Sequence, residues 1–116
     1  LLRFMNSDLA RRLADSPERH SEWPFTLQVE TGLLIQGVLD ACFVEDNQWV
    51  LVDYKTDWGE QDEILGRYRD QMRWYMRALR DITGLPVKEA WLYLLRSGQT
   101  AQVTEIQPIT LEEMGL

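Results

Sequence analysis

The sequence predicts an α/β domain in which helices flank a mixed central β-sheet. Two segments carry hydrophobic residues at helical spacing, and five shorter segments are rich in β-forming residues, as in strands. The expected order is helix, three strands, helix and two strands, which is typical of one α/β domain with a mixed sheet. The 116 residues include five Trp, four Tyr and three Phe, enough large apolar side chains for one core.

The first helix is expected over residues 1–14, where Leu and Met recur at near-helical spacing. Ser16-Pro17 ends this helix, because proline lacks a backbone donor and disfavours helix in the residue before it. A polar connection is expected to extend through Glu22. Residues 25–31 then alternate as in a strand, and Thr31-Gly32 marks a turn.

The second and third strands are expected at residues 33–44 and 48–56, which are rich in β-forming residues. Asp46-Asn47 between them is a turn signal. A long helix follows over residues 60–83 and ends at Gly84, which is followed closely by a proline.

The last two strands are expected at residues 87–95 and 101–106, with a turn at Ser97-Gly98 between them. The final residues are expected to form a short helical turn. No repeat, linker or low-complexity tract interrupts this order, so we expect a single domain.

The composition excludes several classes of protein. The single cysteine, Cys42, cannot form an internal disulfide or build a cysteine-ligated zinc or iron–sulfur site. The formal net charge of −7 argues against a protein that grips nucleic acid by bulk positive charge. No apolar run approaches about 18 residues and no signal peptide is visible, so we expect no membrane contact and a cytoplasmic location. The chain opens on Leu1 inside an apolar pattern, which favours a piece of a larger protein.

The most informative feature is a pair of acids on the expected central hairpin. If Asp46 and Asn47 form a two-residue loop, facing positions sum to 93, and Asp40 faces Asp53. Opposed side chains lie about 4.5 to 5.5 Å apart at Cβ, so the two carboxylates repel unless a cation bridges them. Lys55 lies on the same face as Asp53, one pleat further along.

Carboxylate oxygens in this arrangement favour a hard cation such as Mg²⁺ or Mn²⁺. The alternative is that Asp40 faces solvent, and that Asp53 and Lys55 form an ordinary charge pair at a strand end. Unfavourable placement of charge is typical of functional sites, so the pairing favours a site.

The long helix would face this site with an apolar stripe. Gln71 falls inside the stripe and needs a hydrogen-bond partner, and Tyr75, four residues later, points the same way. These two side chains could order the metal site or contact a substrate backbone. The alternative is a satisfied core glutamine and a tyrosine at the rim of the core. The stripe consists of Ile64, Leu65, Tyr68, Met72, Tyr75, Leu79 and Ile82.

A second stripe on the opposite side of this helix is basic. It consists of Arg69, Arg73, Arg77 and Arg80. Such a stripe could meet phosphates, but we expect a solvated face that also complements the helix C-terminus.

Three motifs, in this order and spacing, resemble the RecB-type nuclease domain of the PD-(D/E)XK superfamily. They are Gly37-Val38-Leu39-Asp40, Asp53-Tyr54-Lys55-Thr56 and Gln71-X-X-X-Tyr75. Asp-X-Lys alone is a weak signal, whereas the three motifs together are a strong one. The spacing is most similar to the C-terminal nuclease of AddA-type helicase–nuclease subunits, and the resemblance covers roughly residues 22–95.

The resemblance implies a restriction-endonuclease-like core. It also implies that residues 1–116 are a single nuclease-like domain, partly truncated at its N-terminus, and a C-terminal fragment of a larger helicase–nuclease.

The site residues implied by the resemblance are the matching positions of the motifs. Asp40 and Asp53 would be metal ligands and catalytic acids, and Lys55 the catalytic lysine. The backbone carbonyl of Tyr54 would add a metal ligand. The helix motif, which supports the site and contacts DNA in the family, would be supplied by Gln71 and Tyr75.

Two further positions concern the metal. Glu22 resembles an acid on the preceding segment that can bind metal in the family. The family also carries a metal-binding histidine on an upstream helix, which the only histidine, His20, does not match. We expect His20 to be solvated, and a fragment without the upstream ligand could bind metal weakly or be inactive.

The implied function is exonucleolytic, metal-dependent hydrolysis of DNA in double-strand-break end processing and recombinational repair, with Mg²⁺ or Mn²⁺ as cofactor. The implied partners are a DNA single strand or duplex end, the rest of a helicase–nuclease polypeptide and a second subunit. One alternative is a catalytically inactive nuclease-like domain that acts as a DNA-end clamp.

Another alternative is a protein-interaction module with Trp23, Trp58 and Trp74 as exposed anchors. Trp58 could also stack on a base, although we favour a rim or core position for it.

Overall fold

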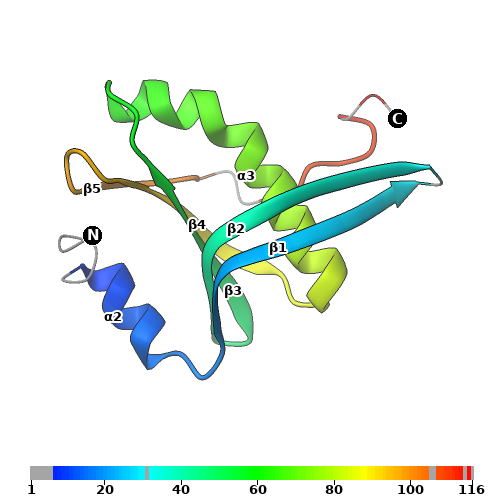
Figure 1. Ribbon diagram of the computed structural model, residues 1–116, viewed down its shortest axis with the longest axis horizontal. Coiled ribbons are helices and arrows are strands. Elements are labelled where there is room, and N and C mark those ends of the chain that lie inside the picture. Colours follow the sequence, from blue (N-terminus) through cyan, green and yellow to red (C-terminus); the bar gives the residue numbers. More distant parts are fainter. Residues whose placement is uncertain (1–6, 31, 105–106, 114, 116) are drawn as a thin grey trace.

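The computed structural model describes residues 7–30, 32–104, 107–113 and 115. Residues 1–6 of the expected first helix, residue 31 and residues 105–106 of the expected last strand lie outside these ranges. The elements in chain order (Figure 1) are α2 (Asp8–Asp15), β1 (Arg19–Glu30), β2 (Leu33–Glu45), β3 (Gln48–Lys55), α3 (Gln61–Thr83), β4 (Val87–Leu94) and β5 (Gln99–Gln102).

The strands form one mixed sheet in the order β1-β2-β3-β4-β5. Neighbouring strands are antiparallel except for β3 and β4, which are parallel. The long helix α3 connects this pair, because parallel strands need a crossover rather than a tight turn. The expected fold class, an α/β domain with a mixed sheet flanked by helices, is therefore confirmed.

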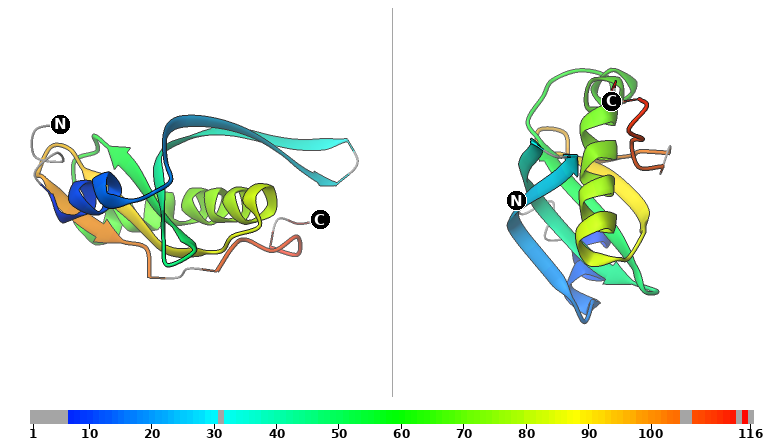
Figure 2. Two further views of the ribbon diagram at one scale, coloured as in Figure 1. Left: turned by 90° about the horizontal axis from the view of Figure 1, so that it is seen from below. Right: turned by 90° about the vertical axis from the view of Figure 1, so that its right-hand side faces the viewer.

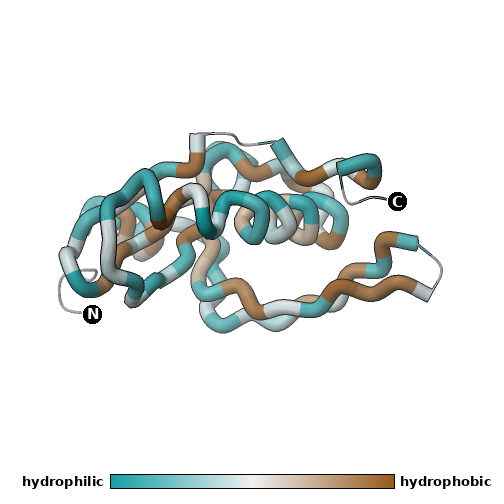
Figure 3. The backbone as a smooth tube through the Cα atoms, turned by 90° about the horizontal axis from the view of Figure 1, so that it is seen from above, coloured by the Kyte–Doolittle hydropathy of each residue, from teal (hydrophilic) through white to brown (hydrophobic). Residues whose placement is uncertain are grey.

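The two helices cover opposite faces of the sheet (Figure 2). Along β3, Trp49 and Leu51 belong to the core under α3, whereas Val50 and Val52 belong to a smaller cluster under α2. All four side chains are fully buried. Successive side chains of a strand point to opposite faces, and both faces of this central strand are covered. Hydrophobic residues accordingly run along the strands, while hydrophilic residues gather at the turns and around much of α3 (Figure 3).

The hairpin of β1 and β2 is longer than expected. The prediction of a polar connection through Glu22 is wrong, because residues 19–21 already pair with residues 41–43 of β2. β1 is an edge strand, so its polar residues reach solvent and Pro24 removes no ladder hydrogen bond that the sheet needs. The far half of the hairpin, residues 23–30 and 33–39, bends away from the sheet and extends over α3 (Figures 1 and 2).

The turn between β2 and β3 is the expected two-residue loop. Asp46 and Asn47 have φ values of 55° and 62°, the left-handed pair that a type I′ hairpin requires. The predicted register, in which facing positions sum to 93, is confirmed from Glu45 and Gln48 to Ala41 and Val52.

Helix α2 is attached to the sheet by its cap and by one arginine. Its N-cap Ser7 accepts a hydrogen bond from the amide of Ala10, and the helix ends at the C-cap Ser16, as expected. Arg12 Nη2 lies 2.7 Å from Glu45 Oε1 and 3.0 Å from Glu89 Oε2. Hydrogen bonds from Arg12 and then Lys88 lower the pKa of Glu45 to about 2, so this carboxylate stays charged.

The expectation of a solvated basic stripe on α3 is wrong for two of its four arginines. Arg73 is only 7% exposed, because the C-terminal segment, residues 107–113, covers it. Its guanidinium donates to the carbonyl of Gln107 at 3.1 Å and to Glu113 Oε1 at 2.8 Å, and Arg77 donates to the carbonyl of Ile109 at 3.0 Å. In Figure 2, α3 lies between the far half of the hairpin and this C-terminal segment.

The end of the chain differs in detail from the expectation. β5 begins two residues earlier than predicted, at Gln99, and the residues at 111–113 form a turn rather than a helix. α3 ends as expected at Gly84, whose φ of 81° satisfies the left-handed C-cap. Within the ranges that the structure describes, neither helix is long and apolar enough to cross a membrane.

Candidate active site

β2 and β3 bring the two acids of the central hairpin together where their ladder ends. The last described pair is Ala41 and Val52, and the next step of this register leads to Asp40 and Asp53. Asp40 Oδ2 accepts a hydrogen bond from the backbone amide of Tyr54 at 2.9 Å, which fixes the carboxylate over β3. The two carboxyl groups are close enough for Asp40 to raise the pKa of Asp53.

Asp53 is a buried acid, with only 3% of its surface exposed. Burial and the neighbouring Asp40 raise its pKa to about 6, and this effect outweighs the opposite influence of Lys55. Lys55 Nζ lies 2.8 Å from Asp53 Oδ2, which makes an ion pair. The Lys55 ammonium is thus the charged partner of Asp53 Oδ2, a buried oxygen with no other donor among the residues that the structure describes.

Helix α3 holds the ammonium group of Lys55 in place. Lys55 Nζ donates to Gln71 Oε1 at 3.0 Å, and it lies 3.9 Å from the ring centroid of Tyr68. The hydrogen-bond partner of Gln71 is therefore the ammonium of Lys55, not another group of the core. Gln71 is linked to the acid pair only through this lysine. The cation–π contact with Tyr68 adds a second constraint on the same ammonium.

Tyr75 reaches the site one turn further along α3. Burial and then the charge of Asp53 raise the pKa of its hydroxyl. The Tyr75 ring meets the ring of Phe25, from the far half of the hairpin, edge to face at 5.6 Å.

The glycine of the first motif makes room for this aromatic pair. A Cβ atom at Gly37 would lie 2.8 Å from two ring atoms of Phe25 and 3.3 Å from Cε1 of Tyr75. Gly37 pairs with Phe25 across the hairpin, so the ring lies directly against the glycine backbone. The absence of a side chain at Gly37 thus sets the position of Tyr75 through Phe25.

Replacing Gly37 with alanine is therefore expected to lower the free energy of unfolding by about 1 to 3 kcal/mol, the usual cost of overpacking a core. The loss is measured by urea unfolding monitored by circular dichroism. Gly66→Ala is the matched control, because a Cβ at this helical position meets nothing within 4 Å. The control is expected to be neutral or stabilising, and an equal effect of both substitutions would contradict the packing role of Gly37.

Glu22 and His20 lie on β1 and do not join the acid pair, and His20 pairs with Cys42 of β2. Glu22 falls between the pairs Ser21–Ala41 and Trp23–Leu39 of the β1–β2 ladder, opposite Asp40. Its φ of 49° marks an irregular backbone position. Its side chain is exposed. His20 is half-buried rather than fully solvated, because its ring stacks on Trp23 at a centroid distance of 4.0 Å. Among the described residues, no three His, Cys, Asp or Glu side chains lie close enough together to hold a metal ion.

The donor set nevertheless fits a divalent cation of the hard type. Asp40 and Asp53 present carboxylate oxygens, and one of these oxygens, Asp53 Oδ2, is buried without a hydrogen-bond donor. Lys55 supplies one positive charge beside the two acids, so a further cation would offset the negative charge that remains on the pair. Magnesium and manganese prefer oxygen ligands and keep several waters, so a pair of carboxylates is an adequate protein contribution.

Tyr68 and Asp57 lie near Lys55, although none of the three sequence motifs includes them. The Tyr68 hydroxyl donates to both carboxylate oxygens of Asp57 at 3.0 Å, and Arg67 also pairs with this acid. The signal for Tyr68 was its position three residues before Gln71, on the same helix face.

The tryptophans proposed as anchors of a protein-interaction module differ in exposure. Trp23 and Trp74 are half-buried, whereas Trp58 is 73% exposed. The rim or core position favoured for Trp58 is therefore wrong. A set of three exposed anchors is not present.

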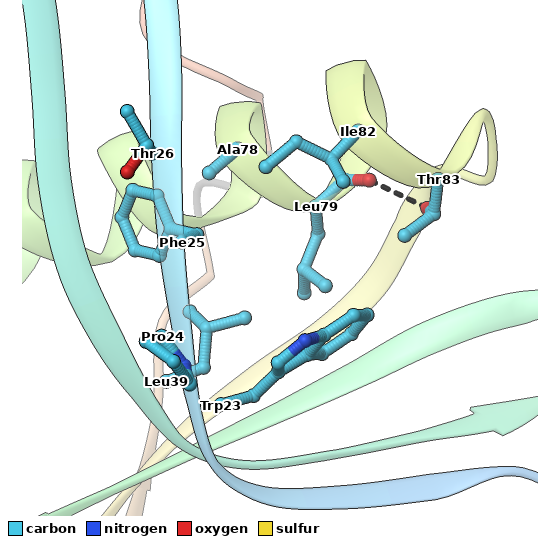
Figure 4. A pocket seen from close by; sticks show the side chains of 9 residues that line it. All are labelled: Trp23, Pro24, Phe25, Thr26, Leu39, Ala78, Leu79, Ile82 and Thr83. Atoms are coloured by element: carbon cyan, nitrogen blue, oxygen red, sulfur yellow. Dashed lines mark hydrogen bonds between the residues drawn. The ribbon is translucent and has the colours of Figure 1, made fainter.

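A cavity of about 210 Å³ lies between the far half of the hairpin and the C-terminal half of α3 (Figure 4). Trp23, Phe25, Leu79 and Ile82 are among its mainly apolar lining residues. None of the residues that line it is acidic, basic or a histidine, so the cavity lacks the groups that hydrolysis requires. The chemistry is concentrated instead around Asp53.

Known proteins resemble this chain over most of its length. The profile of the PD-(D/E)XK nuclease superfamily matches residues 1–115. A protein from Clostridium kluyveri that is named as part of an ATP-dependent helicase/nuclease is 36% identical over 110 residues, which cover 81% of this chain and 9% of the relative. Proteins of the same name from Geobacillus kaustophilus and Clostridium acetobutylicum are 38% and 31% identical, covering 82% and 89% of this chain. The chain spans about a tenth of the length of these curated relatives.

Proposed function

The chain belongs to the PD-(D/E)XK nuclease superfamily, and from this membership we propose that it hydrolyses phosphodiester bonds in DNA with the help of a divalent cation. The resemblance drawn from the three sequence motifs is thereby confirmed, and the relatives named helicase/nuclease support a nuclease role. One observation supports the metal dependence of the proposed activity. Asp53 is buried, is influenced by the charge of Asp40 and forms an ion pair with Lys55.

Asp40 and Asp53 are the proposed metal ligands, and the backbone carbonyl of Tyr54, the residue between Asp53 and Lys55, is a further proposed ligand. A bound Mg²⁺ or Mn²⁺ would polarise a phosphate oxygen and lower the pKa of a bound water. Glu22 is a more distant proposed ligand, since its position opposite Asp40 would allow an exposed side chain to turn toward the metal.

Lys55 is the proposed catalytic lysine. Its ammonium lies beside Asp53 and is held by Gln71 and Tyr68, so its charge stays where a phosphate would approach the acids. Positive charge that is fixed before the reaction offsets the negative charge that develops on the phosphate in the transition state. Gln71 and Tyr75 are the proposed supporting residues, because Gln71 orients Lys55 and the charge of Asp53 acts on the Tyr75 hydroxyl.

The wider role that we propose is exonucleolytic processing of DNA ends at double-strand breaks and in recombinational repair. The names of the relatives support a helicase–nuclease context, in which this chain would be a C-terminal nuclease domain of a polypeptide that works in the cytoplasm with a second subunit. Its proposed substrate is a DNA single strand or a duplex end. Basic surfaces elsewhere in such a polypeptide would guide the DNA, since this chain carries a net charge of −7.

The test is digestion of end-labelled single-stranded and duplex DNA by the 116-residue chain in Mg²⁺ or Mn²⁺. Cleavage is expected with either metal, is expected to stop in EDTA, and is expected to be lost in Asp40→Asn. Cleavage that persists unchanged in Asp40→Asn would contradict the proposed function.

A catalytically inactive DNA-end clamp is a second candidate, favoured by one observation. Within the part of the chain that the structure describes, no third acid or histidine joins Asp40 and Asp53. A clamp is expected to bind duplex ends without degrading them in either metal, at concentrations where the nuclease would have cleaved.

A further inference from the structure

The connection between β3 and α3 carries an acid that is tied to the helix. Asp57 follows Lys55, the last residue of β3, by two positions, and its side chain is 20% exposed. The Tyr68 hydroxyl donates to both carboxylate oxygens of Asp57 at 3.0 Å. Arg67, the preceding residue of α3, forms an ion pair with the same carboxylate. The position of this acid is therefore set by two neighbouring residues of one helix.

The ring of Tyr68 connects this acid to Lys55. The hydroxyl of the ring is bound by Asp57, and the centroid of the ring lies 3.9 Å from Lys55 Nζ. A cation over the face of a tyrosine is attracted by the negative charge of the π-system. Hydrogen bonds in a chain polarise one another, so the bond to Asp57 makes the ring more electron-rich as well as fixing its orientation.

The Tyr68 ring is the third partner of the Lys55 ammonium. Lys55 Nζ lies 2.8 Å from Asp53 Oδ2 and donates to Gln71 Oε1 at 3.0 Å. Tyr68 and Gln71 are three residues apart on α3, so they present their side chains on one helix face. A lysine has a flexible four-carbon stem, so the ammonium would be held by two contacts only if the ring moved away.

We propose that Asp57 is a positioning residue for Lys55, acting through the ring of Tyr68. The carboxylate anchors the hydroxyl, the anchored ring holds the ammonium, and the ammonium stays beside Asp53. This inference rests on the proposed nuclease function, because it assigns Asp57 to the placement of the catalytic lysine.

The first measurement follows Lys55 in the metal-free chain by NMR. The chain has two lysines, so lysine labelled with ¹³C at Cε gives two signals, and Lys88→Met identifies the signal of Lys55. Protons over the face of an aromatic ring resonate upfield, so the Cε methylene of Lys55 is expected upfield of that of Lys88, which pairs with two acids. Asp57→Ala is expected to move the Lys55 signal toward that of Lys88. Asp57→Asn keeps an acceptor for the Tyr68 hydroxyl, so it is expected to keep most of the upfield displacement.

The second measurement separates kcat from KM for DNA cleavage in Mn²⁺. Asp57→Ala and Tyr68→Phe remove the same hydrogen bond from its two ends, so each is expected to lower kcat about tenfold, since a misplaced group costs up to about a hundredfold. KM is expected to stay unchanged, because the charge of Lys55 acts on the transition state. The double variant is expected to be no slower than either single variant.

Asp70→Ala is the control, because it removes an acid whose side chain is 81% exposed elsewhere on α3. The control is expected to keep both kcat and the Lys55 signal. Circular dichroism and urea unfolding check that every variant remains folded. If Asp57→Ala does not fold, Tyr68→Phe tests the same hydrogen bond.

The inference is overturned if Asp57→Ala leaves the Lys55 signal where it is in the wild type, or if the effects of Asp57→Ala and Tyr68→Phe on kcat add. Cleavage by the wild type together with an unchanged Lys55 signal in Asp57→Ala would reject this role and leave the nuclease proposal standing. No cleavage by the wild type in Mg²⁺ or Mn²⁺, with a Lys55 signal that depends on Asp57, would contradict the nuclease proposal and retain the positioning of Lys55.

Discussion

An Asp53→Asn chain is expected to lose metal-dependent DNA cleavage by at least about a hundredfold, because even an outer partner of a metal ligand is typically worth ten- to a hundredfold. The same substitution is expected to stabilise the metal-free chain. Burial and Asp40 raise the pKa of Asp53 from 3.8 to about 6, so the ionised carboxylate at pH 8 costs about 3 kcal/mol of folding free energy. Asparagine removes this charge and keeps the shape.

The pH dependence follows from the same shift. The folded chain holds the Asp53 proton more tightly than the unfolded chain, so this group lowers stability as pH rises from about 3.8 to about 6 and adds no further change above. The stability gained by Asp53→Asn is therefore expected to grow over this range and then stay constant. Urea unfolding in EDTA at several pH values measures the difference.

Asp46→Asn is the matched control for Asp53→Asn. Asp46 is an exposed acid in the turn before β3, and asparagine tolerates its φ of 55° equally well. The control is expected to retain cleavage and to show no such pH-dependent gain. An Asp53→Asn chain that is less stable than the wild type at pH 8 would show that the acid pair is an ordinary structural ion pair.

Lys55→Met is expected to lose cleavage as well, but with the opposite effect on stability. The substitution breaks a buried ion pair and leaves Asp53 beside Asp40 without compensating charge, which costs about 3 kcal/mol in the metal-free chain. A divalent cation replaces the lost charge, so Mn²⁺ is expected to raise the Tm of Lys55→Met more than that of the wild type. Thermal unfolding with and without millimolar Mn²⁺ measures both effects.

The chain contains one other lysine, Lys88, which serves as the control. Lys88 pairs with Glu45 and Asp46 near the surface, so Lys88→Met is expected to keep cleavage and to show no added stabilisation by Mn²⁺. If the two lysine variants responded alike to Mn²⁺, the cation would not be binding beside Lys55.

The register that assembles the acid pair could be predicted because it depends on local chemistry. A two-residue turn at Asp46 and Asn47 fixes every facing position of the hairpin, and a period of two then fixes the face of Lys55. The position of Gln71 within an apolar helical stripe likewise identified a glutamine that needed a partner. Its partner is Lys55, which lies 16 residues earlier in the chain.

Features that depend on distant segments were not predictable in this way. The start of β1 at Arg19 is set by backbone pairing with β2, which the hydrophobic pattern of an edge strand does not reveal. The burial of Arg73 depends on Glu113, 40 residues later, so a helical wheel alone places it in solvent. The sequence alone does not explain the glycine at position 37, because the rings of Phe25 and Tyr75 that lie against it come from distant segments.

The most direct test of the site is calorimetric titration of Mn²⁺ into the 116-residue chain and into Asp40→Asn at pH 8. Asp40 accepts a hydrogen bond from the Tyr54 amide and raises the pKa of Asp53, so its carboxylate is expected to be one of the two acidic ligands. Binding in the wild type at millimolar Mn²⁺ or below, with affinity reduced at least about tenfold in Asp40→Asn, is the expected result. Equal affinity in the two proteins, or no binding to the wild type, would contradict a cation site between Asp40 and Asp53.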